Sequence, residues 1–235
     1  IYLYNFTIME LILVDKFLLL ALDDDKGTFA SEPFAMTYGL AGAILLELSL
    51  KECISIVDKK VIINNQKRTS DVFLGTYLEL MAKTKKTRKL IHWVQTFGKK
   101  ERAIKKEILN KLIVKGILTK REEKILWVFN NDKYLTVNSK PENTLRRRLY
   151  DIVEFGKIPE IDELMLISLI DTCKLNRIVY GKERAKKCKD SIKVIIENSK
   201  NHKVISATIK EVHDTILAMI VVMFTASTTA VITSS

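Results

Sequence analysis

One stretch of this chain is apolar on every side. Between Tyr38 and Leu50 the only charged residue is Glu47, and four small residues would let neighbouring segments approach closely: Gly39, Ala41, Gly42 and Ala43. A helix without a polar face has to be covered by protein on all sides. The sequence therefore predicts a helix at the centre of a hydrophobic core.

The composition favours a mainly helical protein. The 235 residues include only 3 prolines and 8 glycines, while leucine, isoleucine, lysine and glutamate are common. We find no Pro-, Gly- or Ser-rich linker that would separate two folding units. The expected fold class is mainly α: a single globular domain over residues 1–235, with one or two short β-hairpins.

Hydrophobic periodicity and helix-ending residues predict where the other helices and strands lie. Two short apolar runs at residues 54–57 and 61–63, joined by Asp58-Lys59-Lys60, predict a β-hairpin. Helices are expected at residues 11–22, 71–81, 90–97, 101–115, 139–155, 162–173 and 182–197, and a long final helix after residue 202.

The final helix contains an uncharged stretch from Thr215 to Thr233, which is about long enough to span a bilayer. Three polar residues at 227–229 interrupt it, and no cationic residue follows it. A last helix buried in a helical core would have the same composition. We therefore expect burial in the core rather than a membrane span.

Cations gather at the start of one predicted amphipathic helix, residues 101–115. A helix N-terminus already carries partial positive charge, so cations there are unfavourable unless an anion is bound nearby. The whole chain also has a net charge of +11. Both features indicate a polyanionic partner, which is either nucleic acid or an anionic membrane. The five cations are Lys99, Lys100, Arg102, Lys105 and Lys106.

An apolar hairpin is predicted directly after this helix. Residues 124–137 form its two arms, with Asn130-Asn131-Asp132-Lys133 as the turn. Two interpretations stay open for its first arm: insertion into a membrane beside the cations, or packing onto the core or against another subunit. The apolar residues of that arm are Leu126, Trp127, Val128 and Phe129.

The sequence gives little support for an enzyme. No HExxH, GxSxG, GxxxxGK[ST] or GxGxxG motif occurs. The three histidines lie far apart, and the three cysteines form neither a CxxC pair nor an even set. The run from Asp23 to Asp25 is interpreted as a solvated turn rather than a cation site. We therefore expect no catalytic residues, no metal and no cofactor.

Two alternatives to a membrane-binding protein remain. Winged-helix nucleic-acid-binding proteins also contain a helix, a turn and a hairpin in this order. In this chain the turn would be Lys115-Gly116-Ile117-Leu118. A wing needs a basic tip that touches phosphate, whereas residues 126–129 are apolar. The other alternative is an oligomeric protein adaptor that associates through the hairpin and binds no lipid.

Three segments considered together resemble a known family. They read LLLALDDDKG at residues 18–27, GLAGAILLEL at 39–48 and VKGIL at 114–118, the last followed by the apolar hairpin. In their order and spacing they resemble the Golgi phosphoprotein 3 family, which comprises peripheral Golgi proteins and their prokaryotic relatives. The resemblance covers most of the chain.

The resemblance implies a mainly helical domain around a buried helical bundle, without catalysis. It further implies binding of phosphatidylinositol 4-phosphate in a shallow basic pocket beside the hairpin. Eukaryotic members also hold cytosolic tails of Golgi glycosyltransferases and a vesicle coat. The family's two phosphate-binding cations fall on Arg102 and Lys105. Its pocket tryptophan falls on or near Glu32 and a further arginine on Ala41, so half of the eukaryotic lipid site is absent here.

The sequence thus predicts a cytoplasmic, non-enzymatic peripheral membrane protein, at the cytosolic face of the Golgi in a eukaryote. Its expected partners are an anionic membrane lipid, cytosolic tails of membrane proteins and a second copy of itself, but not nucleic acid. The lipid phosphate would be bound by Arg102, Lys105 and the neighbouring Lys99, Lys100 and Lys106. The apolar hairpin residues would anchor the protein in the membrane or join subunits.

Overall fold

The computed structural model of the protein describes residues 11–23, 26–29, 34–64, 67–84, 86–125, 129–198 and 203–232. Its helices are α1 Leu13–Leu20, α2 Ala35–Leu50, α3 Val72–Ala82, α4 Leu90–Gly98, α5 Glu101–Val114, α6 Lys140–Phe155, α7 Ile161–Thr172, α8 Asn176–Tyr180, α9 Lys182–Lys187, α10 Lys189–Asn198 and α11 Lys203–Ile232. Its strands are β1 Leu22–Asp23, β2 Thr28–Phe29, β3 Ile54–Val57, β4 Lys60–Ile63, β5 Arg88–Lys89, β6 Leu118–Ile125 and β7 Phe129–Thr136. The expected mainly α fold is confirmed.

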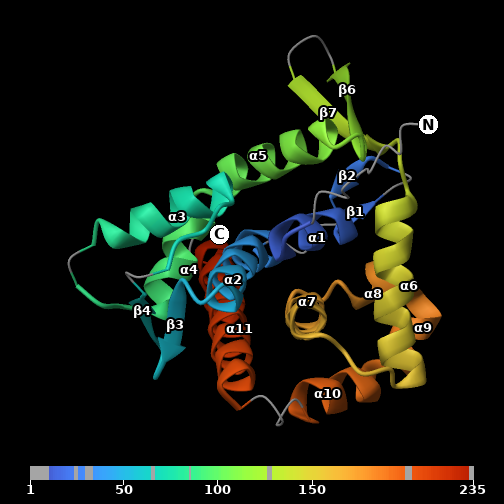
Figure 1. Cartoon of the computed structure of the whole chain (residues 1–235). Helices are drawn as coiled ribbons and strands as arrows, with labels where there is room; N and C mark the ends of the chain where they lie inside the picture. Colours follow the sequence, from blue (N-terminus) through green and yellow to red (C-terminus); the bar gives the residue numbers. More distant parts are fainter. Residues whose placement is uncertain are drawn as a thin grey trace, which may run out of the picture.

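Helix α2 lies at the centre of the core. It packs against α1, α4, α7 and α11, which surround it on several sides (Figure 1). Two of its glycines allow this close approach: a Cβ atom on Gly39 would lie 2.4 Å from the Phe17 ring, and one on Gly42 would lie 2.4 Å from Ile216. The prediction of a central, fully covered helix is confirmed.

The one acidic residue in α2 has a specific structural role. Glu47 is 4% exposed, and its carboxylate accepts a hydrogen bond of 2.7 Å from the backbone N–H of Leu13, at the start of α1. Lys51 lies 3.3 Å from the same carboxylate. A helix start has unpaired N–H groups, so a buried carboxylate from a neighbouring helix satisfies one of them.

Several helix ends follow the predicted signals. The Asp71 side chain accepts a hydrogen bond of 3.0 Å from the backbone N–H of Leu74 and caps α3. Gly116 after α5 and Gly156 after α6 both have φ of +67°, a left-handed conformation that glycine adopts without strain. The predicted helix over 182–197 is instead two helices, α9 and α10, which meet at Cys188.

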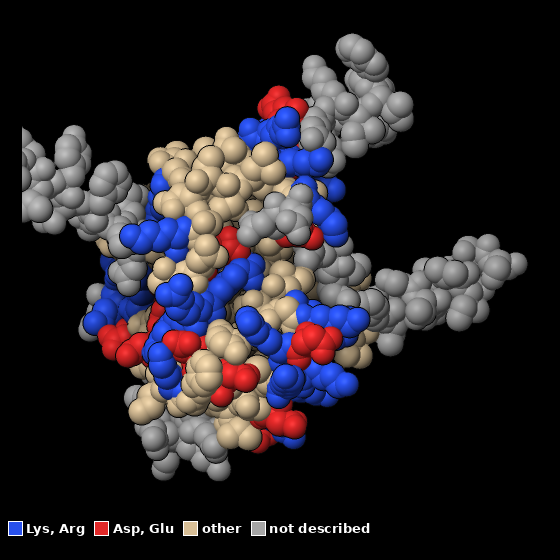
Figure 2. All heavy atoms as spheres, turned by 90° about the vertical axis from the view of Figure 1, so that its right-hand side faces the viewer, with Lys and Arg blue, Asp and Glu red and all other residues tan. Residues whose placement is uncertain are grey.

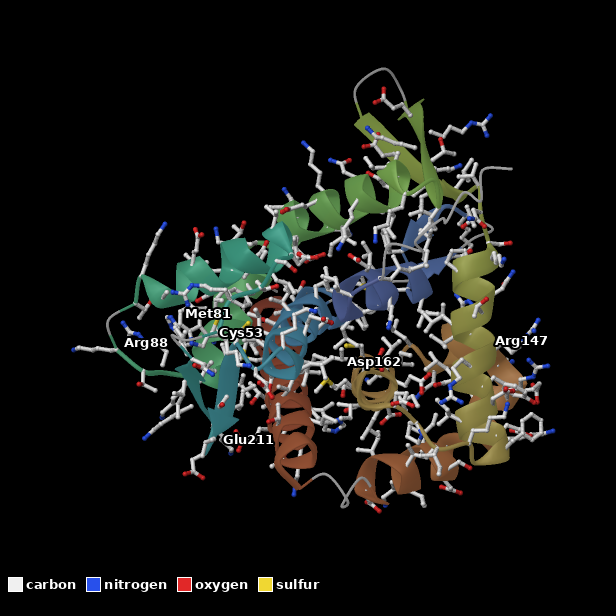
Figure 3. All side chains as sticks on the ribbon, in the orientation of Figure 1. Cys53, Met81, Arg88, Arg147, Asp162 and Glu211 are labelled. Atoms are coloured by element: carbon white, nitrogen blue, oxygen red, sulfur yellow. The ribbon has the colours of Figure 1, made fainter. Side chains whose placement is uncertain are left out.

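Strands β3, β4 and β5 form a small antiparallel sheet at one side of the bundle. Strands β3 and β4 are joined by Asp58 and Lys59, with φ of +50° and +58°, as the favoured two-residue hairpin turn requires. Glu211 on α11 accepts a hydrogen bond of 2.8 Å from the backbone N–H of Lys59 and so connects this turn to the last helix (Figure 3). The predicted hairpin at 54–63 is confirmed.

The second hairpin differs from its prediction. Strand β6 begins at Leu118, and residues 130–133 lie within β7, where they pair with residues 121–124 rather than forming a turn. The charged run from Lys120 to Lys124 forms a strand because charges pair along and across it; Lys120 lies 3.1 Å from Asp132. Leu126, Trp127 and Val128 lie outside the described residues, and of Phe129 only the backbone is described.

The last helix, α11, lies against α2, α4 and α7. Ile209, Val212, Ile216 and Ile220 on it are buried, whereas Leu217 and Val221 are exposed, so the helix packs on the core along one side as far as residue 221. Of residues 222–232 only the backbone is described. Across the part of the chain that the structure describes, no helix combines the length and the apolar character that crossing a membrane requires.

Candidate functional site

A surface pocket of about 710 Å³ lies between helix α5, strand β2, the start of α2 and the β6–β7 hairpin. Helix α5 contributes one wall, and segments far apart in the sequence contribute the others. The pocket is lined by Gly27, Thr28, Phe29, Phe34, Met36, Thr37, Glu101, Arg102, Lys105, Lys106, Leu109, Asn110, Lys120, Asp132 and Tyr134.

Three of the five predicted phosphate-binding cations line this pocket. Arg102, Lys105 and Lys106 are three and four positions apart on α5, so they share one side of the helix. The opposite side carries Ile104 and Ile108, which are buried in the core. Arg102 and Lys106 are exposed, and neither forms an ion pair with a residue that the structure describes.

Lys105 is held in the pocket by two neighbours. Its ammonium lies 4.7 Å from the centre of the Phe29 ring, within range of a cation–π contact, and 3.7 Å from the Glu101 carboxylate. The hydroxyl of Thr37, on α2, donates a hydrogen bond to the same carboxylate. Lys105 is therefore positioned before any ligand binds, and part of its charge is balanced by Glu101.

The hairpin side of the pocket carries one ion pair and one ring. Lys120 lies 3.1 Å from Asp132 and 2.9 Å from Glu122. The Tyr134 ring lies 6.4 Å from the Phe29 ring, centre to centre. Burial raises the pKa of the Tyr134 hydroxyl, so this group is a neutral hydrogen-bond donor at physiological pH.

Gly27 joins the hairpin to the rest of the pocket. Its carbonyl accepts a hydrogen bond of 2.9 Å from the backbone N–H of Tyr134. Its φ is +64°, and a Cβ atom here would lie 3.1 Å from both the Lys133 Cβ and the Tyr134 carbonyl oxygen. Only glycine fits without displacing the strand. The sequence alone did not indicate this contact, because Gly27 and Tyr134 lie far apart in the chain.

The pocket helix is also fixed to the core by an ion pair. Lys111 on α5 lies 2.7 Å from Asp15 on α1 and 3.3 Å from Asp71 at the start of α3. Asp15 is fully buried, and its burial raises the pKa of the carboxyl group against the opposing effect of Lys111. These contacts join three helices and set the position of α5.

The remaining predicted site residues lie elsewhere. Lys99 and Lys100 are exposed in the short connection between α4 and α5 and do not line the pocket. Ala41 is fully buried in α2, away from the pocket lining, and Glu32 lies outside the described residues. The sequence alone did not indicate the aromatic and hydroxyl groups that complete the pocket: Phe29, Phe34, Thr37 and Tyr134.

Fold and pocket together define a class: a mainly helical protein with a cationic surface pocket built on one helix and one hairpin. Among the described side chains, no three His, Cys, Asp or Glu residues gather as metal ligands would. The chain belongs to the Golgi phosphoprotein 3 (GPP34) family, whose model matches residues 13–216. The family is one of Golgi-associated, non-catalytic adaptor proteins.

Proposed function

We propose that this protein is a non-enzymatic peripheral membrane protein that binds the phosphorylated head group of an anionic lipid, of the phosphatidylinositol 4-phosphate type. The observation that carries the proposal is the position of Arg102 and Lys106, exposed at a pocket and without a carboxylate partner among the described residues. A phosphate monoester carries about 1.5 to 2 negative charges and accepts strong hydrogen bonds from such cations.

The other pocket residues suit the rest of such a head group. Thr28, Asn110 and Tyr134 offer hydrogen-bonding groups for ring hydroxyls, and Asp132 and Glu101 accept hydrogen bonds from them. The Phe29 ring supplies an apolar surface beside Lys105. A ligand with both a phosphate group and hydroxyl groups would use more of the pocket than phosphate alone.

In the proposed docked state, residues 126–129 at the hairpin insert into the membrane or contact a second copy of the protein. As an adaptor, the bound protein would hold cytosolic tails of membrane proteins. The family match and the proximity of the hairpin base to the pocket support this arrangement, since Lys120, Asp132 and Tyr134 of the hairpin line it.

Liposome sedimentation of the full chain tests the proposal. The probes are phosphatidylcholine vesicles alone, with phosphatidylserine, and with phosphatidylinositol 4-phosphate. The double variant Arg102→Glu, Lys105→Glu should lose more than about tenfold in affinity for the phosphoinositide vesicles, since each cation at a lipid surface contributes about 1 kcal/mol.

A matched control is available on the same chain. The variant Lys99→Glu, Lys100→Glu makes the same change of charge next to the pocket but outside its lining. It should retain the preference for phosphoinositide over phosphatidylserine. Equal losses in the two variants would mean diffuse attraction without a pocket. Tight, strongly salt-dependent binding to duplex DNA in a gel shift, with none to vesicles, would favour a nucleic-acid binder instead.

A further inference from the structure

A second group of cations lies away from the pocket, on α8, α9 and the start of α10. Residues 174–193 contain eight cationic residues and two acidic ones, and all eight cations are exposed. Such a local excess of positive charge attracts acidic partners. Seven of the eight form no ion pair with any residue that the structure describes: Arg177, Lys182, Arg184, Lys186, Lys187, Lys189 and Lys193.

Aromatic side chains lie next to these cations. The Arg184 guanidinium is 4.6 Å from the centre of the Tyr150 ring, and Tyr150 meets Phe155 edge to face at 5.6 Å. Phe155 ends α6 and is 67% exposed. The thiol of Cys188 donates a hydrogen bond of 3.1 Å to Glu154, which holds the α9–α10 junction against this end of α6. We refer to Tyr150, Phe155, Arg184 and Lys187 as the α6–α9 surface.

Figure 2 looks onto this side of the molecule and shows Lys and Arg side chains spread over it, with smaller groups of Asp and Glu among them. Arg147, on the same helix as Tyr150, also projects outward from α6 (Figure 3). The aromatic groups at the end of α6 thus lie beside the cations of α9. Two acidic residues of α6 are also there, and both have partners: Asp151 pairs with Lys157, and Glu154 accepts the hydrogen bond from Cys188.

The α6–α9 surface lies at the end of α6 that is remote from the hairpin. Helix α6 begins just after β7 and runs away from it (Figure 1). Its 16 residues span about 24 Å, whereas charges in physiological salt are screened over about 8 Å. With the pocket and hairpin on a bilayer, lipid charges would not reach this surface.

We propose that the α6–α9 surface binds an acidic polypeptide segment that also carries apolar side chains, on a partner protein in the surrounding solution. This proposal depends on the proposed function in one respect only, which is the orientation of the protein on the membrane. Acidic side chains of the segment pair with Arg184 and Lys187, and its apolar side chains cover Phe155. Arginine and aromatic residues are the side chains that contribute most to protein–protein interfaces.

The combination of side chains favours a polypeptide over nucleic acid. A duplex would use the cations but leave Phe155 and the neighbouring Ile158, which is 85% exposed, in water. A segment with alternating acidic and apolar residues covers both kinds of group. Its binding should therefore depend on Phe155 as well as on the cations.

Fluorescence anisotropy with the full chain tests the proposal, using a labelled peptide of alternating acidic residues and Leu or Phe. Both Phe155→Ser and the double variant Arg184→Ala, Lys187→Ala should lose about fivefold or more in affinity. The matched control is Lys60→Ala, Lys89→Ala, which removes two exposed charges from the β3–β4–β5 sheet and should change affinity by less than about twofold.

Three results would overturn the proposal. If Phe155→Ser left the affinity for the peptide unchanged, the peptide would be bound by charge attraction alone. If oligouridylate RNA bound as tightly as the peptide, the surface would bind polyanions in general. Loss of phosphatidylserine vesicle binding in the Arg184, Lys187 variant would make the surface a bilayer contact. The Arg102→Glu, Lys105→Glu variant should bind the peptide with unchanged affinity. A failure of the lipid-pocket proposal would therefore appear only in the vesicle sedimentation and would not affect the peptide measurement.

Discussion

Lys111 connects the pocket helix to a buried carboxylate, so its loss should cost more than the loss of any exposed cation. Lys111→Met leaves the fully buried Asp15 without its ion pair, and we expect a decrease of about 3 to 5 kcal/mol in the free energy of unfolding, measured by urea denaturation. Lys106→Met, five residues earlier on the exposed side of the same helix, should change stability by less than about 0.5 kcal/mol.

A second variant distinguishes the effect of the unpaired buried charge on stability from the effect of lost packing. Asp15→Leu combined with Lys111→Met replaces the ion pair with apolar side chains and should recover most of the lost stability. If the double variant were as unstable as Lys111→Met alone, the unpaired charge would not be the cause.

Some residues of the pocket could be predicted from the sequence, and others could not. Arg102, Lys105 and Lys106 could be assigned together because helical periodicity alone puts them on one side. Phe29 and Thr37 lie on different elements, β2 and α2, and Tyr134 lies much later in the sequence, so only tertiary packing brings them to the same pocket. Their types and spacing carry no signal that could have predicted this.

At the scale of elements, the close approach of α1 and α11 to α2 depends on glycine. Gly39→Ala places a methyl group 2.4 Å from the Phe17 ring and 2.7 Å from the Cys173 sulfur, so we expect a loss of about 1 to 3 kcal/mol despite the better helix propensity of alanine. Thermal and urea denaturation would measure it.

Gly75 on α3 provides the matched control. No atom lies within 4 Å of the position that its Cβ would take, so Gly75→Ala should gain about 0.5 to 1 kcal/mol. If both substitutions were stabilising, helices α1 and α2 would be packed less closely at Gly39 than they are in the structure.

The hairpin should act through its apolar residues rather than through its charged strands. Trp127→Ser with Phe129→Ser should weaken vesicle binding if these residues insert into the membrane, and should lower the mass measured by analytical ultracentrifugation if they join subunits. The control Glu122→Gln alters the β6 strand without removing an apolar group. No change in either measurement would exclude both roles.

Elements were predicted well where the apolar pattern was clear, as for the uniformly apolar α2 and the periodic α5, and poorly where no such pattern was present. The run from Lys120 to Lys124 has no apolar alternation, so its strand character follows only from pairing with residues 130–133. The division of residues 182–197 into α9 and α10 likewise depends on packing of this segment against the end of α6, which sequence does not reveal.

For the whole molecule, several buried acids predict instability at high pH. Burial raises the pKa of Tyr77 to about 12 and that of Cys188 to about 11, while the unfolded groups ionise near their ordinary values of 10 and 9. Between those values the folded state binds more protons than the unfolded state, so stability falls as pH rises.

Tyr77 alone accounts for a loss of about 3 kcal/mol by the time pH exceeds 12, because one pKa unit corresponds to about 1.4 kcal/mol. Urea denaturation from pH 8 to higher values would measure the trend. Tyr77→Phe cannot ionise and should show a smaller decrease over this range; an unchanged slope would contradict the assignment.

The ion pair that fixes α5 also restricts how this sequence can change over evolutionary time. Replacing Lys111 leaves the buried Asp15 carboxylate without a partner, and replacing Asp15 removes the buried partner of Lys111, whereas the loss of Asp71 leaves the Lys111–Asp15 pair intact. Related chains that lack Lys111 should therefore have replaced Asp15 too, so these two positions are expected to vary together while Asp71 and the exposed cations drift independently.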